Sequence, residues 1–126
     1  MATTTVLPKT ERYRIMTQYE VEEKAVEYLK TVFDPEIPVN VLDLGMIYKI
    51  DVHPSAEPAE GKEFDIDIDM TFTAPTCPAA DFILEDIQQK LEGIPVVKSV
   101  NVNVVFEPEW NKDMMTEEAK LELGML

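Results

Sequence analysis

Cysteine, histidine and basic side chains are scarce in this chain of 126 residues. Because Cys77 is its one cysteine, no disulfide can form within the chain, and His53 is its one histidine. The 11 Lys and Arg residues stand against 25 Asp and Glu residues, which gives a formal net charge of -14. This charge repels phosphate backbones, so we expect no nucleic-acid partner. Glycine-rich phosphate loops are also absent, which argues against a nucleotide-driven activity.

Long apolar runs are missing as well. No stretch approaches the length of a membrane span, and the first residues do not form a basic segment followed by an apolar one. With no possible internal disulfide, these absences predict a soluble protein of the reducing cytoplasm, without a membrane partner. The length suits one domain with its own core. We expect a flexible N-terminal arm over 1–16 and a single domain over 17–126.

The strongest local pattern is the alternation from Phe64 to Thr73, which predicts a half-buried strand. Its apolar side carries Phe64, Ile66, Ile68, Met70 and Phe72, and its polar side carries Asp65, Asp67, Asp69, Thr71 and Thr73. Aspartates that alternate on one strand lie about 7 Å apart and point to water. We therefore expect a solvated sheet face here rather than a metal site.

The strand is followed by a turn that contains Cys77 and then by a helix over 78–92. Pro78 suits the first turn of a helix, and Gly93 ends it. Cys77 would then lie beside the helix N-terminus, where the helix dipole favours a reactive thiolate. A lone cysteine is also often a small buried hydrophobic residue. The sequence favours the two interpretations about equally.

The other elements follow from similar patterns. Thr17 and Glu20 match a capping box that opens a helix to about Phe33. Further segments are predicted as strands over 44–52 and 96–106, a connecting loop over 53–62, and a short helix from about residue 116. The fold class is α+β, in the order α-β-β-α-β-α, with a small mixed three-stranded sheet and helices packed on one face. His53 is expected to be a solvated loop residue.

A composite site is predicted where two segments share one rim of the sheet. In an antiparallel hairpin the start of the first strand faces the end of the second, so the loop over 34–45 should meet the turn over 71–78. Gly45 is a natural place for a bulge or a close approach by another segment. The predicted rim around Cys77 consists of Asp34, Glu36, Asp43, Thr71, Thr73 and Thr76. Alternatively, Glu36 and Asp43 only cap turns.

The chemistry of this site is limited by its single thiol. A cysteine nucleophile normally needs a base, and His53 should lie at the opposite end of the hairpin, which argues against an enzyme. One thiolate cannot hold an iron-sulfur cluster, which needs about four ligands. Cys77 can still be one metal ligand in a site shared with a second copy of the chain, a partner protein or a small thiol.

Three motifs in this order resemble the MIP18 (DUF59) family of iron-sulfur assembly factors. They are Asp34-Pro-Glu-Ile-Pro-Val with Asp43-Leu-Gly-Met-Ile47, then Met70-Thr-Phe-Thr-Ala-Pro-Thr-Cys-Pro78, then Val100 through Pro108-Glu-Trp110. The chain is most similar to the small bacterial SufT-type proteins. The resemblance implies an accessory, non-enzymatic role in iron-sulfur cluster assembly or maturation, with Cys77 as the functional thiol beside the Asp34–Glu36 loop. It implies partners among the assembly machinery and recipient apoproteins, and a transient iron-sulfur cluster shared between subunits or with a partner.

The sequence leaves open both the function and the role of one apolar patch. The chain could be a structural protein-interaction module whose thiol is incidental. An apolar patch with Trp110 and the Met114-Met115 pair could serve a homodimer or partner contact, or the tail could pack back on the sheet.

Overall fold

The computed structural model describes residues 16–35, 37–73 and 78–124. The predicted arm over 1–16 therefore lies almost entirely outside the described residues. The observed elements are α2 (Gln18–Leu29), β1 (Ile47–Ala59), β2 (Lys62–Met70), α3 (Ala80–Glu92), β3 (Val97–Val104), the 3-10 helix η1 (Lys112–Met114) and α4 (Glu117–Glu122). This order confirms the predicted α+β class, with η1 as an unpredicted addition.

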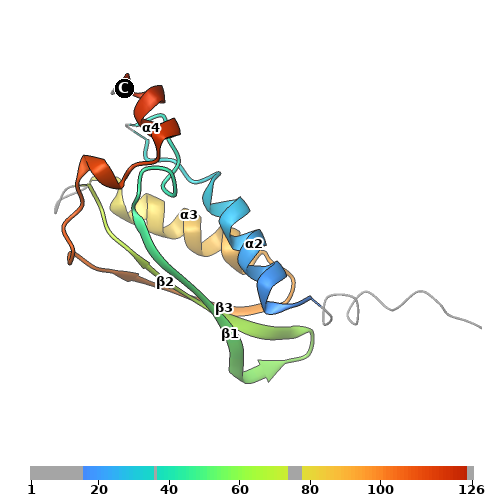
Figure 1. The fold of residues 1–126 in the computed structure, drawn as a ribbon. Helices are drawn as coiled ribbons and strands as arrows, with labels where there is room; N and C mark the ends of the chain where they lie inside the picture. Colours follow the sequence, from blue (N-terminus) through green and yellow to red (C-terminus); the bar gives the residue numbers. More distant parts are fainter. Residues whose placement is uncertain (1–15, 36, 74–77, 125–126) are drawn as a thin grey trace, which may run out of the picture.

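The sheet is mixed and has the order β1-β2-β3, as predicted. β1 pairs with β2 antiparallel, and β2 pairs with β3 parallel. Helices α2 and α3 cover one face of the sheet, while α4 lies at one end of the molecule and the β1–β2 hairpin tip at the other (Figure 1). The core between helices and sheet includes the fully buried Leu29, Ile66, Ile68, Ile83, Ile87 and Leu91. Burial of these side chains is what fixes the helices on this face.

Helix α2 begins as predicted and ends earlier. The Thr17 hydroxyl accepts the Glu20 N–H, and the Glu20 carboxylate accepts the Thr17 N–H, which completes the capping box. The helix ends at Leu29 rather than near Phe33. The reason is that Val32 leaves the helix to join the next loop, where its carbonyl accepts the Val41 N–H at 2.8 Å.

The first strand is the largest correction. The prediction placed it over 44–52 and put 53–62 in a loop, but β1 runs from Ile47 to Ala59, and Ala59 pairs with Lys62 across a two-residue turn. Pro54 and Pro58 obscured this half of the strand. Proline is acceptable there because β1 is an edge strand and need not donate a backbone hydrogen bond to a second neighbour.

His53 consequently belongs to a strand and not to a loop. Its Nε2 donates to the Asp67 carboxylate at 2.9 Å, across the β1–β2 pair. Its Nδ1 lies 3.2 Å from the Pro54 carbonyl oxygen, a second acceptor. The hydrogen bond to Asp67 raises the pKa of His53 above its ordinary value, and the same bond lowers the pKa of Asp67.

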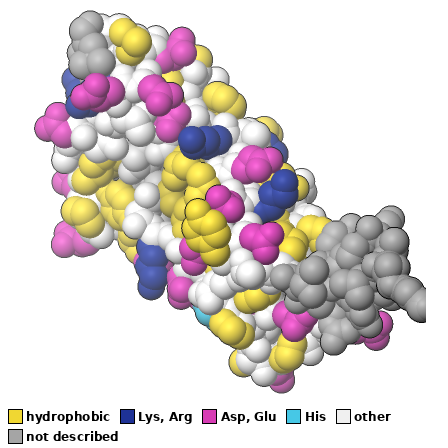
Figure 2. Space-filling view, turned by 45° about the vertical axis from the view of Figure 1, so that its right-hand side comes forward, with side chains coloured by type: hydrophobic (Ala, Val, Ile, Leu, Met, Phe, Trp, Pro, Cys, Tyr) yellow, Lys and Arg dark blue, Asp and Glu magenta, His cyan; other side chains and the backbone are white. Residues whose placement is uncertain are grey.

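The remaining elements confirm the predicted order with shifted boundaries. β2 keeps its alternation but ends at Met70, and β3 spans Val97–Val104 instead of 96–106. Thr116 caps α4 by accepting the Ala119 N–H. Acidic side chains are spread over the face in Figure 2, with scattered basic ones between them, in keeping with the net charge of -14. None of the helices among the described residues has the length and apolar character needed to cross a membrane.

Candidate functional site

The rim of the site begins with the loop between α2 and β1. Phe33 and Asn40 form an isolated antiparallel bridge, which closes the loop at its base. Asp34 follows directly and is buried, with 5% of its surface exposed, and its carbonyl accepts the Ile37 N–H at 3.1 Å. This loop is therefore an ordered part of the fold, and Asp34 belongs to its interior side.

Asp43 is held in a local turn on the same loop. The Asn40 side chain accepts the Asp43 N–H at 2.9 Å and donates to the Asp43 carboxylate at 2.9 Å. The Asp43 carbonyl in turn accepts the Thr116 N–H at 2.9 Å. Asp43 thus stabilises a turn, as the alternative interpretation proposed, and ties that turn to the start of α4.

The end of β2 meets this loop through one backbone hydrogen bond. The Thr71 N–H donates to the Met46 carbonyl at 2.8 Å, next to the Ile47–Met70 pair. Thr71 was expected on the solvated side of the strand but is buried, with 1% of its surface exposed. The alternation stops because β2 ends at Met70 and the chain turns inward. Thr73, which follows the buried Phe72, is half-buried.

Glu36, Thr76 and Cys77 lie outside the described residues, so their predicted places in the site stay predictions. The chain re-enters the described part at Pro78, and α3 begins at Ala80 with Ala79 as its N-cap. The helix therefore begins two residues later than predicted, because its first turn closes with the Ile83 N–H to the Ala79 carbonyl. Cys77 precedes this N-cap by two positions, which weakens the helix-dipole argument for an acidic thiol.

The C-terminal tail packs against the rim, which is one of the two alternatives that the sequence left open for Trp110 and the Met114-Met115 pair. The Trp110 indole N–H donates to the Leu44 carbonyl at 2.8 Å. The Tyr48 hydroxyl donates to the Pro108 carbonyl at 2.7 Å, and Met115 is buried. Trp110 and Met115 thus pack back on the fold, whereas Leu121 stays exposed. The lone tryptophan near the end of the third motif was the available indication of this contact.

Gly45 shows how closely the tail approaches. Its φ is 81°, in the left-handed region, and a Cβ added there would lie 2.3 Å from the Met114 carbonyl oxygen. Glycine is the one residue that fits this position without strain. The prediction of a close approach by another segment is confirmed, and the segment is η1.

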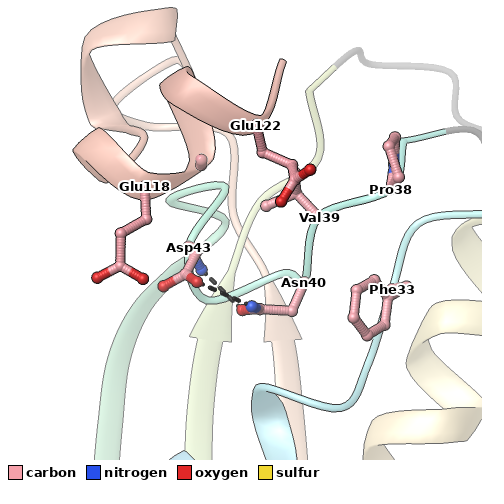
Figure 3. Close-up of a pocket in the computed structure, with 8 residues that line it drawn as sticks. Phe33, Pro38, Val39, Asn40, Asp43, Glu118 and Glu122 are labelled. Atoms are coloured by element: carbon pink, nitrogen blue, oxygen red, sulfur yellow. Dashed lines mark hydrogen bonds between the residues drawn. The ribbon is translucent and has the colours of Figure 1, made fainter. Parts of the chain in front are cut away.

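A small acidic cavity opens beside the rim, between the loop and α4 (Figure 3). Its volume is about 210 Å³, and the acidic side chains on its wall are Asp43, Glu118 and Glu122. A cavity of this size is below the range of about 300–1,000 Å³ that is usual for small-molecule sites. It suits one side chain rather than a substrate, and its carboxylates favour a cationic one.

Comparison with known proteins places these motifs in a family. A family model described as iron-sulfur cluster assembly protein matches residues 22–104. An Fe-S protein maturation auxiliary factor of Porphyromonas gingivalis is 55% identical over 107 residues, which cover 85% of this chain and 94% of that protein. The Fe-S protein maturation auxiliary factor SufT of Staphylococcus aureus is 35% identical over 94 residues, or 75% of this chain and 98% of that protein.

Solved structures of other proteins share this fold. A domain from Bacillus anthracis described as DUF59 superposes with a TM-score of 0.71 at 34% identity, covering 86% of this chain and 96% of that one. A conserved hypothetical protein of Thermotoga maritima superposes with a TM-score of 0.65 at 30% identity, covering 82% and 93%. These likenesses extend over most of both chains in each pair.

Proposed function

The chain belongs to the iron-sulfur cluster assembly protein family of the DUF59 or MIP18 type, and we propose that it is an auxiliary factor in the maturation of iron-sulfur proteins with Cys77 as its functional thiol. The observation that supports this function most directly is the match to maturation auxiliary factors over nearly their whole length. Its cytoplasmic location and its non-enzymatic character remain predictions.

The described part of the rim is tied to the rest of the fold. Backbone hydrogen bonds join the loop over 34–46 to Val32, to Thr71 and to Thr116. Gly45 and Trp110 add the contacts with the tail. In the sequence, Cys77 lies between Thr73 and Pro78, the nearest described residues on either side. A partner that contacts the described rim meets a surface already held in place, and such preorganisation lowers the entropy lost on binding.

A single thiol defines the kind of reaction that the protein supports. A thiolate is a soft ligand suited to iron, but a cluster needs about four ligands. We therefore propose that Cys77 is one ligand to a cluster that the protein passes on as cargo. The remaining ligands come from a recipient apoprotein, the assembly machinery or a second copy of the chain. The acidic cavity beside Asp43 is a suitable place for a basic side chain of that partner.

The test is activation of an iron-sulfur enzyme in cell extract that lacks this protein. We expect wild type to restore client activity and Cys77→Ser to leave it at the level without the protein. Asp65→Asn is the control, because Asp65 lies on the sheet face that the helices do not cover, where it accepts a hydrogen bond from Ser99. This variant should restore activity as wild type does. Full activity of Cys77→Ser would overturn the role of the thiol and favour an interaction module with an incidental cysteine.

Anaerobic reconstitution with iron and sulfide then distinguishes a carrier from an adaptor. If wild type gains cluster absorption as a dimer by sizing chromatography and Cys77→Ser does not, the ligand set is shared between two copies. If wild type remains colourless and monomeric until a recipient apoprotein is added, the remaining ligands come from the partner. Cluster uptake by Cys77→Ser equal to that of wild type would contradict a ligand role for this residue.

A further inference from the structure

The outer face of the sheet carries a regular grid of polar side chains, remote from the rim. In the register of the sheet, Asp51 lies opposite Asp67 and His53 lies opposite Asp65, while β3 adds Ser99, Asn101 and Asn103 beside the β2 aspartates. Aspartates along β2 alone are too far apart to share an ion. Pairing with β1 changes this, because it brings side chains of a second strand beside them.

Three side chains of this grid converge. One ligand atom each from Asp51, His53 and Asp67 lies within 4.8 Å of the others, and all three residues are half-buried. We propose that they form a binding site for a divalent transition-metal ion, with His53 Nε2 and one carboxylate oxygen from each aspartate as ligands. When the ion binds, the protonated His53 ring releases its Nε2 proton to solvent and keeps its Nδ1 proton, which it donates to the Pro54 carbonyl, so the neutral ring binds the ion through Nε2.

Neighbouring side chains orient this ligand set. Asn101 Nδ2 donates to Asp67 Oδ1 at 3.3 Å, so Oδ2 is the oxygen that faces His53. Outer partners of this kind fix the orientation of a metal ligand and add to its affinity. The other two β2 aspartates are engaged elsewhere, because Asp65 accepts from Ser99 and Asp69 accepts from Asn103.

Charge is the second reason to expect a cation. Asp51 and Asp67 are directly opposite in the register, and like charges in opposite positions destabilise a sheet. Among the described residues, no hydrogen bond or ion pair is observed for the Asp51 carboxylate. Its charge is offset in part by the His53 ring when that ring is protonated, and an ion bridging Asp51 to Asp67 would take over this role and remove the repulsion.

The donor set selects the class of ion. Imidazole suits zinc, copper, iron and nickel, whereas magnesium and calcium prefer oxygen ligands alone. Magnesium also gives up its waters reluctantly and needs near-ideal octahedral geometry. One imidazole and two carboxylates therefore match a divalent transition metal. The exposed side of the strand pair leaves room for water to complete the coordination.

The experiment is calorimetric titration of the full chain with Zn²⁺ in the Cys77→Ser background, which removes the competing thiol. We expect one equivalent to bind, and we expect His53→Gln and Asp51→Asn each to weaken binding by about 10-fold or more. Asp69→Asn, which makes the same charge change as Asp51→Asn on the same sheet face but on β2, should bind Zn²⁺ within about twofold of the background. Co²⁺ absorption and the shift of the His53 ring resonances provide readouts at the ligands themselves.

Two results would overturn the site. If His53→Gln binds Zn²⁺ as tightly as the background while remaining folded by circular dichroism, the ion is held elsewhere. If Mg²⁺ binds as well as Zn²⁺ and the His53 resonances do not move, the face only collects counterions. Since Cys77 is absent from this background, neither result bears on the proposed role in maturation.

Discussion

Gly45 and Gly61 lie near opposite ends of the β1–β2 hairpin, and both have a left-handed backbone, with φ of 81° and 74°. Their surroundings differ. A Cβ at Gly45 would lie 2.3 Å from a backbone oxygen of Met114, whereas a Cβ at Gly61 would meet nothing within 4 Å. The same backbone conformation thus serves a packed junction at the rim end and an open turn at the tip end.

The difference shows how each end of the hairpin is built. The rim end depends on contacts between segments far apart in the sequence, such as Trp110 with Leu44 and Thr116 with Asp43. The tip end depends on the pairing of two adjacent strands, which close at a two-residue turn after a register shift between Pro54 and Ala59. Substitutions at the rim should therefore cost more stability than equivalent ones near the tip, and the two glycines provide a matched pair.

Gly45→Ala carries the largest expected effect. The left-handed backbone costs an alanine about 1–2 kcal/mol, and the overlap with Met114 adds about 1–3 kcal/mol. We expect the free energy of unfolding to fall by about 3 kcal/mol in urea denaturation. Gly61→Ala should lose only the backbone part, about 1 kcal/mol. Equal losses at both positions would contradict the close approach of the tail to the rim.

Trp110→Phe tests the same junction with a smaller change. It keeps most of the ring but removes the indole N–H, which leaves the Leu44 carbonyl without that donor. An unsatisfied buried acceptor costs about 1–3 kcal/mol, and the half-buried position of Trp110 argues for the lower part of this range. Urea denaturation followed by circular dichroism measures the loss. Tyr19→Phe, at an exposed aromatic on α2, is the control and should change stability by less than about 0.5 kcal/mol.

The sequence predicted those features that local chemistry determines. The Thr17 capping box and the alternation of β2 each depend on neighbours a few residues away, and both are confirmed. Gly45 was identified as a point of close approach, but its partner at Met114 could not be, because no local pattern indicates which distant segment returns. The burial of Thr71 was not predicted, because it depends on segments that meet at the end of β2, such as the one that contains Met46.

His53 illustrates the limit most directly. The prolines of β1 obscured the second half of the strand, so the histidine was assigned to a loop. Its partner Asp67 was compared only with the other aspartates of β2. Both errors have one source, since β1 continues past His53 to Ala59, and a register shift between Pro54 and Ala59 decides which β2 residues lie beside His53. At the rim, the sequence indicated that loop and turn meet, but Glu36, Thr76 and Cys77 lie outside the described residues.

The smallest expected effect is the pH dependence of the His53–Asp67 pair, measured in protein treated with chelator. A raised pKa means that His53 stabilises the fold below its ordinary pKa of 6.5, and that this contribution is lost as pH rises through the raised value. A lowered pKa means that Asp67 stabilises above its ordinary pKa of 3.8, and that this contribution is lost as pH falls through the lowered value. Both contributions are therefore fully present only between these two ordinary values.

Asp67→Asn should accordingly lower the pKa of His53 towards 6.5 in an NMR titration of the ring resonances. The difference in unfolding free energy between wild type and this variant should be greatest within the window and decrease on either side. The difference should be small throughout, because more than a third of each side chain is exposed and water screens the pair. Asp69→Asn, which lies farther along β2, should move the pKa of His53 much less. If the pKa of His53 is unchanged in Asp67→Asn, the hydrogen bond between His53 and Asp67 does not persist in solution. The two strands would then be joined there by backbone pairing and packing, without an electrostatic contribution from this pair.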